Sequence, residues 1–341
     1  MVDESSRTQI VPSGAGVAVN PVAVADLSVV VCAFSMARLE LTVAAVAALA
    51  AQDPAPSQIV VVVDYNEPLR ALLAERVKGA EVFSNEEPRG LSGARNTGLR
   101  HSTASIVAFV DDDAEAAPGW SRAMLAAFSD TAVVGVGGVA VPSWDHGVPA
   151  WFPEELLWAV GCSYRGQADT GEVRNPLGCN MAFRGDAIRS IGAFDPTLGR
   201  LGTLPFGCEE TELCVRLRAA ARDARIIITR DSVVHHHVPA ERSSLRYVWQ
   251  RSYYEGIGKS MLRRLSSGDS LGTERSYALR VLPGAVLRDL GGLLLLRAPG
   301  TRIKRISAIV GSLGLAGIGY VVGLVTRPAG PAAEAQERER S

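Results

Sequence analysis

Short apolar segments alternate with helix-like segments through the first third of the chain. Runs of Val and Ile bounded by polar turns are typical of buried β-strands. The expected strands are 27–32, 58–63, 81–83 and 105–110, and the expected helices between them are 38–51, 67–77 and 93–101. This alternation indicates an α/β domain around a mostly parallel sheet, in which ligands bind beyond the carboxyl ends of the strands.

The pattern is less regular in the middle of the chain. Residues 142–178 contain three tryptophans and many glycines and prolines, so we expect long loops and short helices there. Residues 209–221 have the periodicity of an amphipathic helix. Residues 226–228 are expected to form a strand that leads into three consecutive histidines.

One segment near the carboxyl end is long and apolar. Residues 306–325 carry no charge, and Arg302, Lys304 and Arg305 precede them. A membrane span needs about 20 such residues, and positive charge on the amino-terminal side fits entry from the cytoplasm. A buried helix or a helix that packs on a partner is an equally good interpretation.

These patterns divide the chain into five parts. We expect a disordered lead (1–26), a catalytic α/β domain (27–240), a helical extension (241–300), the apolar possible membrane segment (301–327) and a disordered tail (328–341). The lead has no sustained apolar run, so we do not expect it to be a secretory signal. We therefore expect the catalytic part to stay in the cytoplasm.

Composition excludes few functions. The chain has 341 residues, 47% of them hydrophobic and 21% charged, with a formal net charge of -1. That balance gives no reason to expect a nucleic-acid partner. The five cysteines are an odd number and include no C-x-x-C pair. Reduced thiols therefore fit better than a zinc ribbon or a disulfide framework.

An acidic cluster follows the fourth expected strand. Asp111, Asp112 and Asp113 repel one another and need a counter-charge, which Mg²⁺ or Mn²⁺ bridging a diphosphate would supply. Alternate residues of an extended strand face the same way, so Asp111 and Asp113 are expected to face the ligand together. The alternative is a solvated acidic turn that caps a helix.

Several motifs together resemble the family 2 glycosyltransferases. The first group is 29–34, the strand ending at Asp64, 89–98 (RGLSGARNTG) and 109–113 (FVDDD). The second group is 180–184 (NMAFR), 191–195 (IGAFD) and 209–213 (EETEL). The resemblance covers about residues 27–238. Residues 151–158 and 161–164 are similar to a subgroup that extends lipid-linked glycans.

The resemblance implies a GT-A fold, in which a Rossmann-like nucleotide-binding half joins an acceptor-binding half, and an inverting displacement. It implies that Asp64 contacts the donor base, that Asp111 lies near the ribose and diphosphate, and that Asp113 binds the metal. Asp111 is also a candidate metal ligand, and Asp112 is a further candidate for binding the donor. Arg95 and Asn96 would line the donor side. Asn180, Trp151 and Trp158 are candidates for the acceptor side, although such tryptophans are more often core anchors.

Inversion needs a carboxylate base that deprotonates the acceptor hydroxyl. The family usually has Glu-Asp at a helix start, and this chain has Glu209-Glu210 there, so Glu210 is the expected base. Because Glu is one methylene longer than Asp, Glu209 and Glu212 remain alternatives. Simple compensation of the helix dipole would also place acids at this position.

Two further groups have two interpretations each. His235 and His237 would share one face of a strand and could hold the metal or diphosphate, or they could pack under a loop. A basic and aromatic segment contains Arg242, Arg246, Arg251 and Lys259. It could contact a diphosphate or an anionic lipid surface, but a solvated amphipathic helix is slightly favoured.

The sequence therefore predicts a metal-dependent, inverting glycosyltransferase of the hexosyltransferase type. Its donor would be a nucleoside-diphosphate sugar, and its acceptor a glycan or polyprenyl-linked glycan at the inner face of the cell membrane. One alternative is a sugar nucleotidyltransferase, although residues 32–38 lack the glycines of a triphosphate loop. Another is a non-catalytic protein that binds sugar nucleotides.

Overall fold

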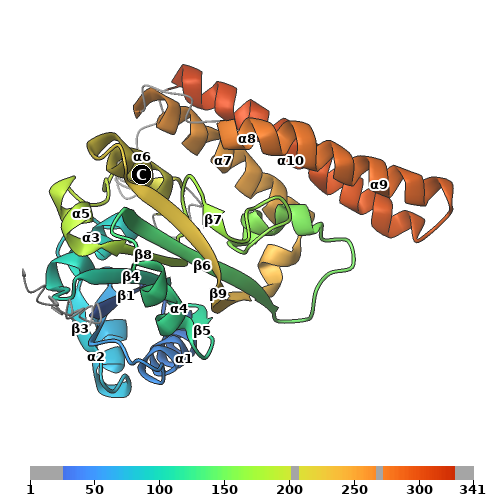
Figure 1. Ribbon diagram of the computed structural model, residues 1–341. Coiled ribbons are helices and arrows are strands. Elements are labelled where there is room, and N and C mark those ends of the chain that lie inside the picture. The colour runs from blue at the N-terminus through green and yellow to red at the C-terminus, as the bar shows by residue number, and fades with distance from the viewer. Residues whose placement is uncertain (1–25, 201–206, 266–271, 327–341) are drawn as a thin grey trace, which may run out of the picture.

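The computed structural model describes residues 26–200, 207–265 and 272–326. Apart from Asp26, the expected disordered lead and tail lie outside these residues. The described chain forms one sheet of nine strands, with eight in the order β3-β2-β1-β4-β8-β6-β9-β5 and β7 paired to β9 (Figure 1).

The first half of the sheet is parallel, as the sequence predicted. Its strands are β1 (Leu27–Ala33), β2 (Gln58–Val63), β3 (Glu81–Ser84) and β4 (Ile106–Asp111). The connecting helices are η1 (Met36–Arg38), α1 (Leu39–Ala50), α2 (Glu67–Arg76) and α3 (Leu91–His101). The α/β class is therefore confirmed, and each expected element lies within two residues of the observed one.

The second half makes the sheet mixed. Here β8 (Asn180–Arg184) runs antiparallel between β4 and β6 (Val133–Trp144), and β9 (Arg225–Val238) runs parallel to β6. The short strands β5 (Ala114–Ala116) and β7 (Gly171–Glu172) pair antiparallel with β9. Because β9 extends to Val238, the three histidines lie on the strand and do not follow it.

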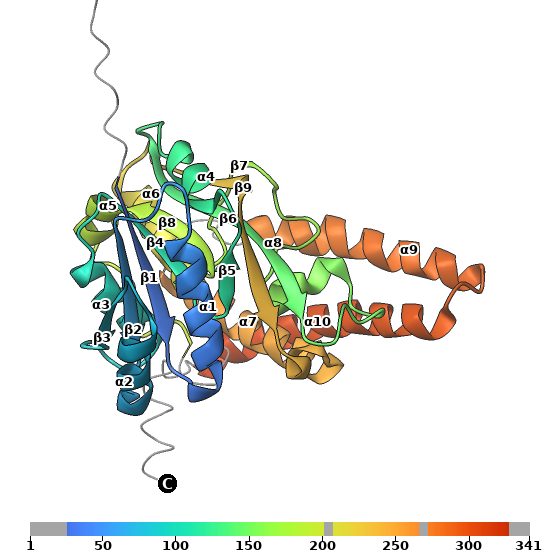
Figure 2. The same cartoon turned by 90° about the horizontal axis from the view of Figure 1, so that it is seen from below.

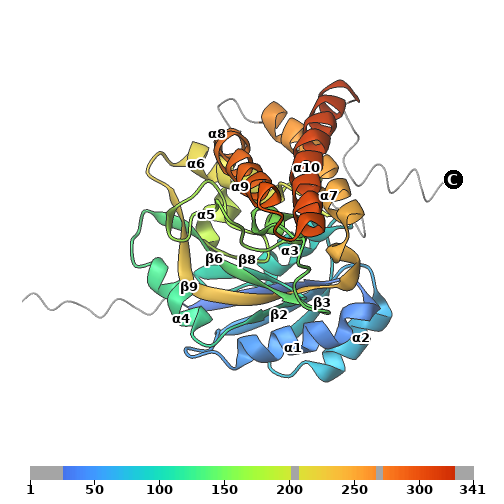
Figure 3. The same cartoon turned by 90° about the vertical axis from the view of Figure 1, so that its right-hand side faces the viewer.

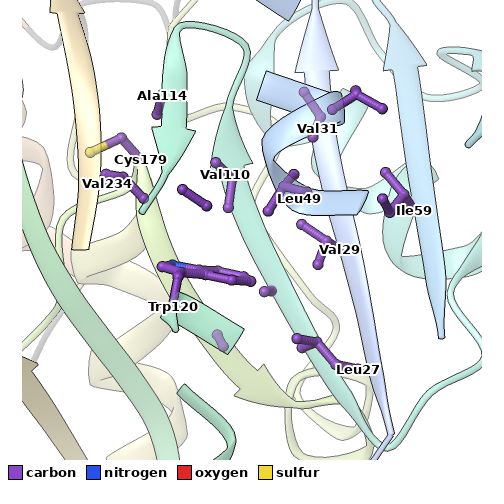
Figure 4. Packing of buried hydrophobic residues seen from close by; sticks show 14 of the residues in the cluster. Leu27, Val29, Val31, Leu49, Ile59, Val110, Ala114, Trp120, Cys179 and Val234 are labelled. Carbon is purple, nitrogen blue, oxygen red and sulfur yellow. The ribbon is translucent and has the colours of Figure 1, made fainter. Parts of the chain in front are cut away.

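Two apolar layers cover the two faces of the sheet. On one face, α1, α2 and α4 (Trp120–Ala127) bury Leu49, Leu69 and Trp120 against alternate residues of β1, β2 and β4 (Figure 4). On the other face, α3, α5 (Gly185–Ser190) and α6 (Glu209–Ala220) cover the remaining alternate residues. Because both faces of the sheet are buried, the sequences of these strands are continuous runs of apolar residues, mainly Val and Ile.

A helical extension lies on the side of the sheet opposite α1 and α2 (Figure 3). It contains η3 (Ala240–Ser243), α7 (Leu245–Leu265), α8 (Gly272–Ser276), the π-helix η4 (Tyr277–Val281), α9 (Leu282–Leu294) and α10 (Pro299–Thr326). The 3-10 helix η2 (Glu154–Val160) packs beneath it in a third apolar cluster. The helices α9 and α10 project together from the body of the molecule (Figure 2).

Candidate active site

A pocket of about 250 Å³ opens at the carboxyl ends of β1, β2 and β4. The sheet contributes Asp64, Asp111 and Asp112 to it, because each of these residues ends or follows a strand. The opposite wall comes from the helical extension, with Arg242 on η3 and Tyr247, Gln250 and Arg251 on α7. The pocket thus lies where ligands bind in open α/β sheets, and the extension closes it.

The acidic cluster is organised around Arg38. The Nη1 atom of Arg38 donates to Asp112 Oδ1 at 2.7 Å, and its Nη2 atom lies 2.9 Å from Asp113 Oδ2. Asp113 Oδ1 lies 3.3 Å from His236 Nε2. Asp111, Asp113 and His236 each have one potential metal-ligand atom, and these three atoms lie within 4.8 Å of one another.

Burial and neighbouring charges act in opposite directions on these groups. Burial raises the pKa of Asp112 to about 7, despite the Arg38 guanidinium. Burial alone would also raise the pKa of Asp113, but His236 and Arg38 hold it well below its usual range. Burial would lower the pKa of His236, and Asp113 instead raises it to about 10. Without a bound cation, Asp113 and His236 therefore form a charged pair in the interior, and His236 would lose its proton on binding a metal ion.

The cluster fits a divalent cation. Both oxygens of Asp113 and one of Asp112 are buried and, among the described residues, accept no well-formed hydrogen bond. Arg38 and His236 approach the two oxygens of Asp113 without meeting hydrogen-bond geometry, so a bound cation would compensate the buried charge more fully. The two carboxylates are ligands that Mg²⁺ and Mn²⁺ prefer, and neutral imidazole is a common metal ligand that could complete the set.

The structure brings one histidine to this cluster, and it is the middle one. His236 is buried, whereas His235 is exposed and His237 bonds Asp145 at 2.6 Å. The expectation that His235 and His237 face the metal is therefore corrected. From Ser232 onward the even-numbered residues of β9 point inward, and the apolar Val234 and Val238 on either side of His236 indicated this parity in the sequence.

Two of the expected donor residues have direct links to the site. Asp64 lines the pocket and accepts hydrogen bonds from the Asn85 side chain at 2.7 Å and from the Gly90 backbone at 3.1 Å. Arg95 is fully buried, donates to Glu209 at 2.8 Å and lies 3.5 Å from Asp111. Arg95 therefore connects the acidic cluster to the start of α6.

Asn96 has a different place from the one expected. Its side chain exchanges two hydrogen bonds with the backbone of Phe194, at 2.8 and 2.9 Å. It does not line the described pocket. Asn96 therefore holds the segment after α5 against α3, and the structure does not bring it to the donor side.

The three candidate bases differ in their partners. Glu209 is paired with Arg95, and Glu212 with Arg216 at 2.5 Å. Glu210 forms no ion pair within the described residues, and its nearest hydrogen-bond donor is the Thr211 hydroxyl at 3.4 Å. Burial, followed by repulsion from Glu209, raises the pKa of Glu210 to about 7. The Glu210 carboxylate thus has no ion-pair partner among the described residues, and its pKa lies near neutral pH. It does not line the described pocket.

The expected acceptor residues are largely structural. Asn180 is completely buried: its amide donates to Val139 O and Ser232 O, both at 3.1 Å, and its Oδ1 accepts from Trp120 at 2.9 Å. The structure therefore leaves it no contact with an acceptor. Trp151 packs on Phe152 in the third apolar cluster, whereas Trp158 lies under the guanidinium of the pocket residue Arg251.

Sequence reasoning missed part of the positive charge in the pocket. Arg38 and Arg200 were not singled out, and the segment containing Arg242 and Arg251 was favoured as a solvated helix. Arg242 is only 8% exposed, and neither it nor Arg200 has a carboxylate partner in the described chain. Burial and the neighbouring Arg242 and Arg251 lower the pKa of Arg200. The pocket therefore has two arginines without a direct carboxylate contact beside its acidic floor.

Comparisons with known proteins agree with this geometry. The model for glycosyl transferase family 2 matches residues 28–192. A glucosyl-dolichyl phosphate glucuronosyltransferase of Haloferax volcanii is 31% identical over 306 residues, which are 88% of this chain and 96% of that protein. The succinoglycan biosynthesis protein ExoM of Rhizobium meliloti is 26% identical over 66% of this chain and 71% of its own length.

A solved structure shares the fold. It is a mannosyltransferase from Pyrobaculum calidifontis in complex with GDP-Man and Mn²⁺, with a TM-score of 0.59 and 16% identity, and the match covers 89% of this chain and 88% of that one. The expected GT-A fold is confirmed. The chain therefore belongs to glycosyltransferase family 2.

Proposed function

We propose that this protein is a metal-dependent, inverting glycosyltransferase. It moves a hexose-type sugar from a nucleoside-diphosphate sugar to a glycan or polyprenyl-linked acceptor at the inner face of the cell membrane. The observation that carries the proposal is the joint placement of two features in one site. Asp111, Asp113 and His236 form a compact ligand set, and four buried or half-buried arginines line the adjoining pocket.

A diphosphate accounts for both features. Asp111, Asp113 and His236 would hold Mg²⁺ or Mn²⁺, which neutralises charge on the departing nucleoside diphosphate when it is bound. Arg200 and Arg242 have no carboxylate partners in the described chain, so an anionic ligand would compensate them. The Pyrobaculum mannosyltransferase, which was solved with GDP-Man and Mn²⁺, supports this donor class through its shared fold.

Other residues would act on the reactants directly. Asp64, held by Asn85 and Gly90, would bind the donor base, and Asp112 would stay near the ribose and diphosphate with Arg38. Glu210 would take the proton from the acceptor hydroxyl, because it is the uncommitted carboxylate at the start of α6. Arg95 would position Asp111 and Glu209 through its two contacts.

The acceptor is proposed from the Haloferax relative. That protein is named for a glucosyl-dolichyl phosphate acceptor and a glucuronosyl donor, and the two sequences align over nearly their full lengths. A lipid-linked sugar is therefore the first acceptor to test, and a uronic-acid nucleotide belongs among the donors. Trp158 is the remaining candidate for stacking on an acceptor sugar, because it lies beside Arg251 at the pocket wall.

A donor panel tests the proposal. UDP-, GDP- and dTDP-sugars would be incubated with Mn²⁺ or Mg²⁺ and a lipid-linked acceptor extract, and release of nucleoside diphosphate would be measured. We expect release from one donor, its loss with EDTA and its loss in Asp113→Asn. Glu115→Gln is the matched control, because Glu115 lies on β5 two residues later and is exposed. Donor binding without release on any acceptor would instead support a non-catalytic sugar-nucleotide protein.

A further inference from the structure

The pair α9–α10 has a continuous apolar outer surface. At the turn between the helices, Leu294, Leu295 and Leu296 are 85%, 64% and 82% exposed. Along α10 the exposed apolar residues recur as one stripe that includes Ile303, Val310, Leu313, Ile318, Val321 and Val325. At 100° per residue this stripe occupies an arc of about 140°. We call the leucine turn and this stripe the hairpin surface.

The opposite face of α10 is fixed to α7. A Cβ atom on Gly256 of α7 would lie 2.1 Å from Ala316 O, and one on Gly319 would lie 2.0 Å from Tyr253 O, so the two backbones touch. Arg264, which follows on α7, donates to Gly323 O at 2.8 Å. Closer to the turn, the buried Asp289 of α9 pairs with Arg302 and Arg305 of α10 at 3.0 and 3.1 Å.

This packing conflicts with a membrane span. By length and composition alone, α10 could cross a bilayer. However, α7 runs beside residues 311–324 and carries Arg251, Glu255 and Lys259. Inserting α10 across the bilayer would either bury these charges in hydrocarbon or break the helix pair.

The charge around the hairpin surface favours an anionic lipid surface. Residues 277–326 contain six cationic side chains and one carboxylate, that of Asp289. Arg280, Arg297 and Lys304 are exposed and make no ion pair with any described residue. Two copies of such a surface would repel each other, whereas anionic headgroups would attract it. Exposed leucines beside unpaired cations are the pattern of an interfacial membrane helix.

We propose that the hairpin surface inserts into one leaflet of an anionic bilayer and that α10 lies in the membrane interface without crossing it. This inference deepens the proposed function, because it gives the lipid-linked acceptor a route to the pocket. The helix α7 carries Tyr247, Gln250 and Arg251 at the pocket and packs on α10 along its length. The membrane contact and the pocket wall are therefore parts of one rigid helix pair.

Vesicle binding tests the surface. The full-length protein would be sedimented with phosphatidylcholine vesicles, with and without phosphatidylglycerol, in the absence of donor. We expect Leu294→Ser/Leu296→Ser to weaken binding at least tenfold on both lipids. Arg297→Gln/Lys304→Gln should weaken it about tenfold on the anionic vesicles alone. Leu72→Ser is the control, because Leu72 is an exposed leucine of α2, and α2 lies on the opposite side of the sheet from α9 and α10 (Figure 3).

Membrane topology distinguishes lying on the bilayer from spanning it. In inverted membrane vesicles from an expression host, protease should remove a tag at either end of the chain. Protection of the carboxyl-terminal tag would overturn the proposal in favour of a span. Unchanged vesicle binding in the leucine variant would also overturn it. So would the finding that the unchanged protein is a dimer without lipid and that the leucine variant is a monomer, because the hairpin surface would then bind a second copy of the chain. Nucleotide release in the donor panel is measured separately, so failure of either proposal leaves the other standing.

Discussion

The position of His236 gives the most specific expectation for a single residue. Its imidazole lies 3.3 Å from Asp113, whereas the neighbouring His235 points to solvent. We expect His236→Ala to weaken Mn²⁺ binding at least tenfold, since loss even of groups that only orient metal ligands costs 10- to 100-fold. His235→Ala should bind Mn²⁺ normally. Titration followed by electron paramagnetic resonance measures both, and equal affinities in the two variants would exclude the proposed ligand set.

The pH dependence of transfer tests Glu210. Its pKa is raised to about 7, so the carboxylate loses its charge as the pH falls through that value. A general base acts only when deprotonated, so the rate should decline below about pH 7 and level off above it. Glu210→Gln should lower the rate by about 10² to 10⁴-fold with donor affinity retained.

The matched variant is Glu212→Gln. Glu212 is already paired with Arg216, so this change should preserve the pH profile. If Glu212→Gln abolishes transfer while Glu210→Gln does not, the assignment of the base moves to Glu212.

At this scale the sequence located the cluster but not every ligand. The run of three aspartates and the strand before it were visible, and so was the need for a counter-charge. The choice among three histidines depended on how far β9 extends, because strand parity decides which side chain points inward. Asn180 was a candidate acceptor residue because its motif resembles that of the family. Its side chain is instead buried by hydrogen bonds to Trp120, Val139 and Ser232, and such tertiary contacts cannot be predicted from the local sequence.

Among the elements, the contact between α7 and α10 makes a sharp prediction about two glycines. A Cβ on Gly319 would meet the Tyr253 carbonyl at 2.0 Å, whereas a Cβ on Gly314 has nothing within 4 Å. We expect Gly319→Ala to lower the free energy of unfolding by about 1 to 3 kcal/mol, because the backbones must separate. Gly314→Ala should raise it by about 0.5 to 1 kcal/mol through helix propensity. Urea denaturation measures both changes, and the same sign for both would contradict the packing.

Element boundaries were predictable where packing is regular. The Val and Ile runs of β1, β2 and β4 predicted those strands closely, because both sheet faces are buried. The second half of β9 was not predicted, since the polar segment Thr229–Ser232 interrupts the apolar pattern. The strand continues there because β6 and β5 pair with it on its two sides, with a shift of register between Gly137 and Val139. Such pairing joins segments far apart in the sequence and leaves little local signal.

The whole molecule shows why the basic segment was misjudged. Read alone, residues 242–259 resemble a solvated amphipathic helix, because basic and aromatic side chains are interspersed along them. In the fold, η3 and α7 lie across the carboxyl end of the sheet, so Arg242 on η3 and Arg251 on α7 close a pocket whose floor is more than 100 residues earlier in the chain. The apolar segment 306–325 was equally ambiguous, and its contact with α7 is what favours a helix at the membrane surface.

These two roles of α7 lead to a prediction about the acceptor. A protein held at the bilayer meets a lipid-linked acceptor at high local concentration, whereas it meets a water-soluble analogue only at its bulk concentration. Leu294→Ser/Leu296→Ser should therefore reduce transfer to a vesicle-embedded acceptor at least tenfold and leave transfer to a short-chain soluble acceptor unchanged. Both rates are measured as nucleoside-diphosphate release from the same donor. An equal loss on both acceptors would mean that the leucines support the pocket itself, and an equal retention would mean that the acceptor reaches the pocket without the membrane contact.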